Sequence, residues 1–358
     1  MAHMPRCTGH QHVRGAWIEA SEPAVAYGPP CCSKDGDNFM TRPNSCGTQR
    51  TVHSPYMDTG LTVKAKRTWP LAHMGGNACS CVGHVDRLVW RPSHCSIAPF
   101  DGERFCAALG RRRLLFIGDS TMQQIATTVM SWAQWSFWPQ AANGCADQLA
   151  YAPSDTLIHR PLGRLNRGQG LAGALRGFKP DVLVAASGAH IYGEENYQTM
   201  LRGVADILAQ LRSPPKLIWA TTTGAGCGAE PLADSSPWSL QALWRDLDAR
   251  SVRTHNWANF SVFDMLARHF WQSGHANGTC VLDLKPLHQR VDARIESPRR
   301  AAYADPGGPK SPRMTAAGEW RKAKRSDGYR DCLHFCSPGP LNLVPTLLQQ
   351  VLEECARG

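Results

Sequence analysis

A serine at the junction of an apolar run and an amphipathic stretch is the first residue that could do chemistry. Leu114 to Ile117 is fully apolar, as in a strand buried on both faces, and Gly118, Asp119 and Ser120 follow directly. Apolar residues then recur at helical spacing until Pro139. A hydroxyl at the start of a helix lies where backbone N–H groups converge, and it can attack an acyl carbonyl if a base takes its proton. On position alone, capping of the helix is the simpler interpretation.

The base must be one of 14 histidines, and His334 is the leading candidate. Asp331 lies three residues before it, so a carboxylate could hold the imidazole Nδ1–H and leave Nε2 facing a serine. Neither short motif is specific alone. Their order along the chain and their contexts favour a catalytic triad of Ser120, His334 and Asp331.

Alternating strand-like and helix-like segments must position these residues. Residues 181–186 and 216–222 read as buried strands, residues 197–211 as a helix, and residues 344–351 carry the apolar side of a last helix. Further predictions are short strands at 156–159 and 260–264 and a helix at 238–252. This alternation predicts an α/β fold with a parallel sheet, whose working site lies at the carboxyl ends of the strands.

The first part of the chain has a different composition. Residues 1–106 contain eight of the 14 cysteines with frequent Pro and Gly, which indicates a loop-rich lobe held by disulfides. We therefore expect a Cys-rich lobe at 1–105 packed on a catalytic domain at 106–358. A metal site is the weaker alternative, because thiols in an oxidising compartment usually pair with each other; it would draw on Cys79, Cys81, His84, His94 and Cys95.

The net charge of +10 is unevenly placed. Residues 294–325 hold nine Lys/Arg and three Asp/Glu, a net of +6, in a Pro-, Gly- and Ala-rich context. The simpler interpretation is a flexible basic insertion at about 289–327, and the alternative is a basic rim that attracts an acidic polymer. We expect no nucleic-acid partner.

Two sequons, at Asn259 and Asn277, and the cysteines together indicate the secretory pathway, in the Golgi lumen or outside the cell. No run of about 18 apolar residues exists, so no membrane span is predicted. The initial Met-Ala-His-Met does not resemble a signal peptide, and a signal or membrane anchor would belong to a longer precursor.

The motifs resemble the PC-esterase superfamily, which includes the trichome-birefringence-like polysaccharide O-acetyltransferases and animal and algal relatives, within the SGNH/GDSL hydrolase group. The resemblance covers about residues 85–355. It rests on Gly118-Asp119-Ser120, on Asp331-Cys332-Leu333-His334 with the following Phe335 to Pro340, and on Trp90-Arg91-Pro92, Cys95, Phe100 and Phe105.

The resemblance implies a three-layer α/β/α SGNH-like fold and an acyl-serine mechanism. Ser120 would be the nucleophile, His334 the base and then the acid, and Asp331 the orienting carboxylate. An acetyl donor and a glycan or polysaccharide acceptor would be the partners, with no bound cofactor and no metal ion. The oxyanion hole would use the Ser120 N–H with Ser187 and Gly188, and Asp119 and His190 would lie near the substrate.

The chain departs from the family pattern at Ser187, where SGNH enzymes typically carry asparagine. A further oxyanion glycine would be Gly163, Gly168 or Gly170. The predicted function is O-acetyl transfer to a glycan hydroxyl. The alternatives are a carbohydrate acetyl esterase that uses the same triad and a non-catalytic glycan-binding protein.

Overall fold

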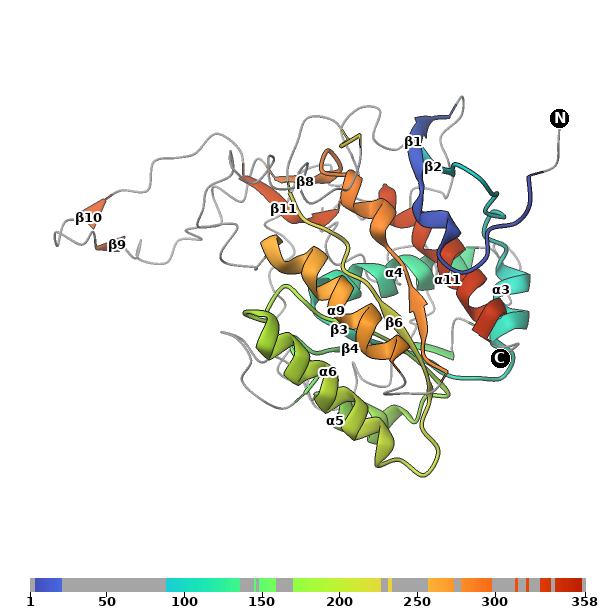
Figure 1. The fold of residues 1–358 in the computed structure, drawn as a ribbon, viewed down its shortest axis with the longest axis vertical. Coiled ribbons are helices and arrows are strands. Elements are labelled where there is room, and N and C mark those ends of the chain that lie inside the picture. The colour runs from blue at the N-terminus through green and yellow to red at the C-terminus, as the bar shows by residue number, and fades with distance from the viewer. Residues whose placement is uncertain are drawn as a thin grey trace.

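Five parallel strands form the sheet that carries Ser120. In this computed structural model, the described residues are 4–20, 88–135, 145, 148–158, 170–226, 231–233, 257–273, 278–297, 313–314, 320–321, 329–335 and 339–355. The sheet has the order β4-β3-β5-β6-β7, with bounds Leu149–Pro153, Leu114–Gly118, Val182–Ala186, Lys216–Ala220 and Cys280–Leu282. Figure 1 labels β3, β4 and β6 of this sheet. All four neighbouring pairs run parallel, which confirms the α/β class predicted from the sequence.

The interior strand β3, between β4 and β5, supplies apolar side chains to both faces of the sheet. Leu114 and Phe116 join one buried cluster, and Leu115 and Ile117 join the other, as the alternation of side chains along a strand requires. All five residues of β3 are buried. A strand without a polar side chain until its carboxyl end is therefore stable only in the middle of this sheet.

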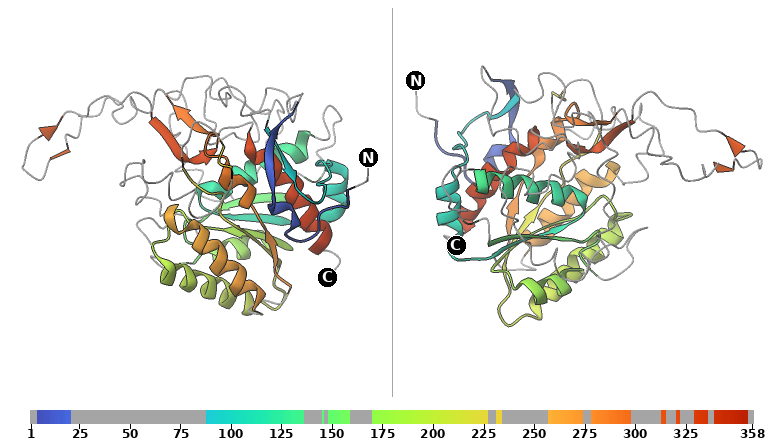
Figure 2. Two further views of the ribbon diagram at one scale, coloured as in Figure 1. Left: turned by 45° about the horizontal axis from the view of Figure 1, so that its top comes forward. Right: turned by 180° about the vertical axis from the view of Figure 1, so that it is seen from behind.

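Helices cover both faces (Figure 2). The first cluster takes side chains from α3, α4 and α11, which span Gly102–Leu109, Ser120–Trp135 and Leu343–Cys355. The second takes them from α5, α6 and α9, which span Gly170–Phe178, Glu194–Ala209 and Phe260–Gln272. Ser120 therefore opens a helix that packs on one face of the sheet.

In the described part of the chain, three small antiparallel pairs stand apart from the main sheet. They are β1 with β2, β8 with β11 and β9 with β10. Their bounds are Gly15–Glu19, Leu88–Pro92, Arg294–Ser297, Tyr329–Phe335, Arg313–Met314 and Trp320–Arg321. The short 3-10 helices are η1, η7, η8 and η9, at Gln11–Val13, Trp257–Asn259, Lys285–Gln289 and Pro340–Asn342.

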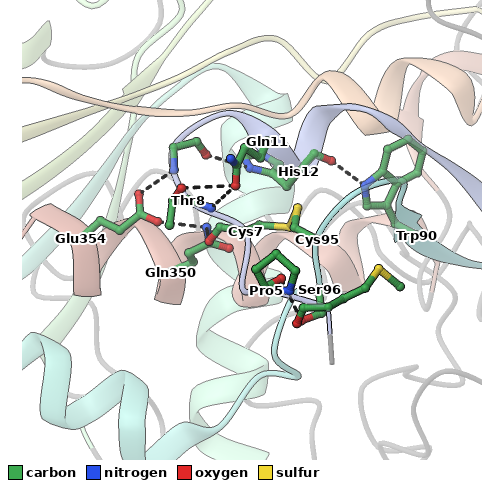
Figure 3. Close-up of a disulfide and its surroundings, with 12 residues drawn as sticks. Pro5, Cys7, Thr8, Gln11, His12, Trp90, Cys95, Ser96, Gln350 and Glu354 are labelled. Carbon is green, nitrogen blue, oxygen red and sulfur yellow. Dashed lines mark hydrogen bonds between the residues drawn. A yellow bond between two sulfur atoms is a disulfide. The ribbon is translucent and has the colours of Figure 1, made fainter. Parts of the chain in front are cut away.

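The described N-terminal residues are anchored to the C-terminal helix. Cys7 forms a disulfide with Cys95, and the Gln350 side chain on α11 donates to the Cys7 carbonyl at 2.7 Å (Figure 3). The Trp90 indole donates to the His12 carbonyl at 2.7 Å. Cys95 is thus engaged by Cys7 and not by the alternative metal site. Helix α3 spans the predicted boundary at 105–106, and residues 21–87 of the predicted lobe lie outside the described residues.

Two predicted strands are wrong, one strand of the main sheet was missed, and none of the strands in the three small pairs was predicted. Residues 260–264 begin α9, because Phe260, Phe263, Ala267 and Trp271 recur on one helical face and are all buried. The strand expected at 156–159 lies earlier, as β4 at Leu149–Pro153. The short β7 was not predicted. The predicted strands at 181–186 and 216–222, the helix at 197–211 and the last helix are confirmed within a few residues. The helix at 238–252 falls outside the described residues.

The described cysteines indicate an oxidising environment. Disulfides join Cys7 to Cys95, Cys106 to Cys145 and Cys280 to Cys355, which agrees with the predicted secretory setting. Within the described ranges, no helix is both long enough and apolar enough to cross a membrane. Asn259 of the first sequon lies immediately before α9, and Asn277 of the second falls outside the described residues.

The predicted basic insertion begins inside the core. Gln289, Arg290 and Arg294 are buried, so the stretch that leads into β8 is not a solvent-exposed loop. Arg290 pairs with Asp292 at 2.9 Å, and its guanidinium lies over the Trp17 ring. Apart from β9 and β10, residues 298–327 lie outside the described part of the chain.

Candidate active site

The turn from β3 into α4 places Ser120 at the carboxyl edge of the sheet. Gly118 ends the strand, and a Cβ there would lie 2.1 Å from the Ala186 carbonyl oxygen of the neighbouring strand. Only glycine therefore permits β3 and β5 to approach each other at the point where the turn begins. Ser120 is the first residue of α4, where backbone N–H groups have no acceptor within the helix.

His334 meets Ser120 directly. The Ser120 Oγ lies 2.8 Å from the His334 Nε2, although the two residues are 214 positions apart. A hydroxyl that donates to Nε2 requires this nitrogen to be unprotonated, which places the ring proton on Nδ1. His334 is buried and Ser120 is half-buried. The structure thus brings together the predicted nucleophile and the predicted base.

An irregular strand pair presents His334. Strand β11 pairs with β8 through Asp331 and Ile295, and again through Phe335 and Arg294, with a shift of register between them. Such a bulge redirects side chains out of a regular ladder. The Asp331 side chain lies outside the described residues, so its contact with the His334 Nδ1–H stays a prediction.

Asp119 ties the nucleophile turn to the loop after β5. Its Oδ1 accepts from the Thr121 backbone N–H at 2.9 Å and from the Thr121 hydroxyl at 2.7 Å. Its Oδ2 accepts from the N–H groups of Gly188 and Ala189 at 3.1 and 3.2 Å. The carboxylate is buried, so this geometry assigns it to positioning of the turn, and contact with substrate stays a prediction.

The loop predicted to complete the oxyanion hole is engaged internally. The Ser187 hydroxyl donates to the Asp155 carbonyl, and the Gly188 N–H donates to Asp119. Neither group is available to an oxyanion in this arrangement. Of the alternative glycines, Gly170 begins α5, and Gly163 and Gly168 lie outside the described residues.

His190 lies on the same loop as Ser187. Its Nε2 is 3.8 Å from an Asp155 carboxylate oxygen, and its side chain is 15% exposed. The imidazole is therefore close to the carboxyl edge of the sheet, near a buried acid. Trp132 on α4 packs edge-on against Phe100, with the ring centroids 5.5 Å apart.

Tyr151 on β4 supports the same turn from the other side. Its hydroxyl lies 3.0 Å from the Gly118 carbonyl oxygen and 3.2 Å from that of Asp119, and it donates to them. Burial, and then the nearby charges of Asp119 and Asp155, raise the pKa of the Tyr151 hydroxyl. Tyr151 therefore stays a protonated donor to the main chain before Ser120.

A second polar cluster, formed by Thr222, Asp264 and His288, lies after β6. Asp264 accepts from the Thr222 backbone N–H at 2.7 Å and from the Thr222 hydroxyl at 3.0 Å. The His288 Nε2 donates to the Thr222 carbonyl at 2.9 Å. Burial raises the pKa of Asp264 to about 8 and lowers that of His288 to about 4. Between these values both groups are neutral, which suits their buried positions.

Sequence reasoning did not assign this cluster or the buried Gln124, whose amide bonds the main chain of Phe335. Asp264 had been read as part of a strand, and the only signal for Gln124 was a polar residue four positions after Ser120.

Comparison of this sequence with protein-family models and with curated proteins found no match.

Proposed function

We propose that this chain is a serine O-acetyltransferase that moves an acetyl group through an acyl-serine intermediate to a hydroxyl of a glycan or polysaccharide. The observation that carries the proposal is the 2.8 Å contact between the Ser120 hydroxyl and the His334 Nε2 at a strand-to-helix turn. The carboxyl edge of a parallel sheet, where this contact lies, is the usual place for a catalytic site in α/β proteins.

The proposed chemistry uses His334 twice. The Ser120 Oγ attacks the acetyl carbonyl while the His334 Nε2 takes its proton, and collapse of the tetrahedral intermediate expels the donor's leaving group with that proton. His334 then takes a proton from the acceptor hydroxyl, whose oxygen attacks the acetyl carbon. As the bond between the acetyl carbon and the Ser120 Oγ breaks, His334 returns that proton to the Ser120 Oγ. Asp331 is proposed to hold the Nδ1–H throughout.

The first turn of α4 is the proposed source of oxyanion stabilisation. The backbone N–H of Ser120 and the positive end of the helix dipole lie at the nucleophile itself. Ser187 and Gly188 would contribute only if Asp155 and Asp119 released them. The arrangement of the sheet and its two helical coverings supports an SGNH-like three-layer fold, and the disulfides support a Golgi or extracellular setting.

Acetyl labelling tests the proposal. The protein is incubated with an activated acetyl ester, with and without candidate glycans, and the Ser120 peptide is examined by mass spectrometry. Acetyl-Ser120 followed by acetyl on sugar is the expected result. Free acetate alone indicates the esterase alternative, because transfer and hydrolysis differ only in what accepts the acetyl group. No acetyl-Ser120 from folded protein contradicts acyl-serine chemistry and leaves the glycan-binding alternative.

Ser120→Ala is expected to abolish both labelling and turnover while the melting temperature stays close to that of the native chain. The change removes one oxygen atom from a half-buried side chain, together with its hydrogen bond to His334, so it opens no large cavity. Ser273→Ala, in an exposed residue after α9, is the matched control. Turnover retained by Ser120→Ala would end the proposed mechanism.

A further inference from the structure

The main chain on both sides of His334 is held by two buried side chains. On one side, the Gln124 Nε2 donates to the Phe335 carbonyl at 2.9 Å, and the Phe335 N–H donates to the Gln124 Oε1 at 3.1 Å. This amide makes the same pair of bonds that a neighbouring strand would make to one residue. It fixes the peptide immediately after His334.

Arg294 holds the peptide immediately before His334. Its Nη1 donates to the Leu333 carbonyl at 2.7 Å, and its Nε donates to the Gly226 carbonyl at 3.1 Å. The guanidinium carbon also lies 3.8 Å from the centre of the Phe335 ring. Arg294 is buried, so these bonds are made in a medium where they are strong.

The two residues that flank His334 in the sequence pack into different hydrophobic clusters. Phe335 belongs to the core cluster that includes α4, and Leu333 belongs to the cluster on the other face of the sheet. The β8–β11 register shifts at this point, so a regular ladder does not set the local conformation. The side chains of Gln124 and Arg294 supply hydrogen bonds there.

We infer that Gln124 and Arg294 are positioning residues that set the distance between Ser120 and His334. Ser120 and Gln124 lie about one turn apart on α4, so one rigid helix both carries the hydroxyl and clamps the main chain of the imidazole. Their catalytic importance rests on the proposed function. Their effect on the imidazole does not.

Nitrogen-15 NMR of histidine-labelled protein tests the inference without requiring turnover. The His334 signals are assigned by their loss in His334→Gln. In the native chain we expect an unprotonated Nε2 that accepts from Ser120. In Gln124→Met, which keeps the side-chain length but removes both bonds to Phe335, these signals should move toward those of Ser120→Ala. Arg294→Met should shift them in the same direction.

Acylation of Ser120 provides the second measurement. A loss of about 100-fold in the acylation rate is expected for Gln124→Met, since misplacement of a catalytic group by about 1 Å has effects of that order. KM for a small acyl ester should change little, because the Gln124 and Arg294 side chains are buried and bonded to main-chain groups. Gln124→Glu keeps the acceptor for the Phe335 N–H but not the donor to the Phe335 carbonyl. This variant replaces Gln124→Met in both measurements if the Met variant does not fold.

Gln349→Met is the matched control. Gln349 is also buried on a helix, and it bonds the Asp101 N–H at 2.9 Å and the Glu353 carboxylate at 3.1 Å, away from His334. It should lose comparable stability with unchanged His334 signals. Unchanged His334 signals in folded Gln124 variants, or an equal displacement in Gln349→Met, would overturn the inference. If the Gln124 variants displace the His334 signals but the native chain never forms acyl-Ser120, the clamp is supported and the proposed function is refuted.

Discussion

Asp119 precedes the proposed nucleophile and uses both carboxylate oxygens to bind protein donors. Four hydrogen bonds, two to Thr121 and two to the Gly188–Ala189 main chain, converge on one buried side chain. A negative charge beside the first turn of α4 is also favoured by the helix dipole. The acidic residue of the Gly-Asp-Ser motif thus stabilises the junction of two loops beside Ser120.

Asp119→Asn is expected to lower the free energy of unfolding and to slow acylation of Ser120. The amide NH₂ would face N–H groups that need an acceptor, and each buried N–H left unpaired costs about 1–3 kcal/mol. Urea denaturation measures the stability, and acetyl labelling measures the rate. Asp181→Asn is the control, because Asp181 is exposed and accepts from the Arg113 N–H at 2.8 Å. Equal stability of the two variants would show that the Asp119 bonds contribute little.

Three elements meet at the Thr222, Asp264 and His288 cluster. Thr222 follows β6, Asp264 lies on α9 and His288 lies on η8, so the buried hydrogen bonds tie a helix and a 3-10 helix to the end of a strand. The Thr222 methyl group also lies beside Gly188: a Cβ atom added to Gly188 would be 3.3 Å from it. The cluster therefore supports the loop that Asp119 binds from the other side.

The cluster predicts a pH-dependent stability. The folded chain retains the Asp264 proton up to about pH 8, whereas an unfolded chain releases it near 3.8, so the Asp264 contribution is full below pH 3.8 and is lost as the pH rises to 8. The His288 contribution is full above 6.5 and is lost as the pH falls to about 4. Below pH 6.5 the Asp264 and His288 contributions to stability change in opposite directions with pH. Above pH 6.5, of these two, the Asp264 contribution alone still changes.

Asp264→Asn should therefore remove a loss of stability between pH 6.5 and 8 that the native chain shows. The loss attributable to Asp264 is at most about 2 kcal/mol over this interval, because each pH unit corresponds to about 1.4 kcal/mol per proton. Urea denaturation at the two pH values measures it, with Asp181→Asn as the exposed control. An identical pH slope in the native chain and Asp264→Asn would contradict the raised pKa.

The sequence predicts the elements whose pattern is unambiguous. Short continuous apolar runs identify β3 and β5, because such runs suit strands that are buried on both faces and are too short for a helix. Phe260 to Asp264 was misread because aromatic and β-branched residues at the start of α9 also suit a strand, and the helical period appears only when Ala267 and Trp271 are included. The three-residue edge strand β7 offers too short a pattern to detect.

Sequence-based prediction paired Ser120 with His334 because both carry chemistry in their residue types and both follow recognisable segments. The two side chains lie 2.8 Å apart, and their catalytic roles stay predictions. The prediction from sequence had limits. It did not extend to Gln124 or Arg294. Their roles depend on which main-chain groups they bond. Gln124 bonds Phe335, 211 positions away, and Arg294 bonds Leu333, 39 positions away, and local sequence spacing does not contain that information.

At the scale of the whole molecule, disulfides tie distant parts of the chain to the sheet. Cys280 on the edge strand β7 is bonded to Cys355 at the end of α11, with 75 positions between them. Cys106 on α3 is bonded to Cys145, with 39 positions between them. Cross-links over such separations restrict the unfolded chain strongly.

The double variant Cys280→Ser/Cys355→Ser is expected to lower the free energy of unfolding by about 2–4 kcal/mol, the usual contribution of a disulfide that closes a long loop. Both cysteines lie away from the Ser120–His334 contact, so acylation at a temperature where the variant stays folded should continue. Thermal denaturation with and without reductant measures the effect. A variant as stable as the oxidised native chain would contradict the expected stabilisation.

The same two cross-links give the proposed catalytic pair an unusual covalent setting. Ser120 lies inside the ring closed by Cys106 and Cys145, and His334 lies inside the ring closed by Cys280 and Cys355. Their hydrogen bond is therefore a contact between two covalent rings. Oxidative folding that exchanged cysteines between the rings would give a chain of identical mass and thiol content in which the pair need not meet. Under the proposed function, acyl-serine labelling would therefore detect a loss of native pairing that mass and thiol counting would not.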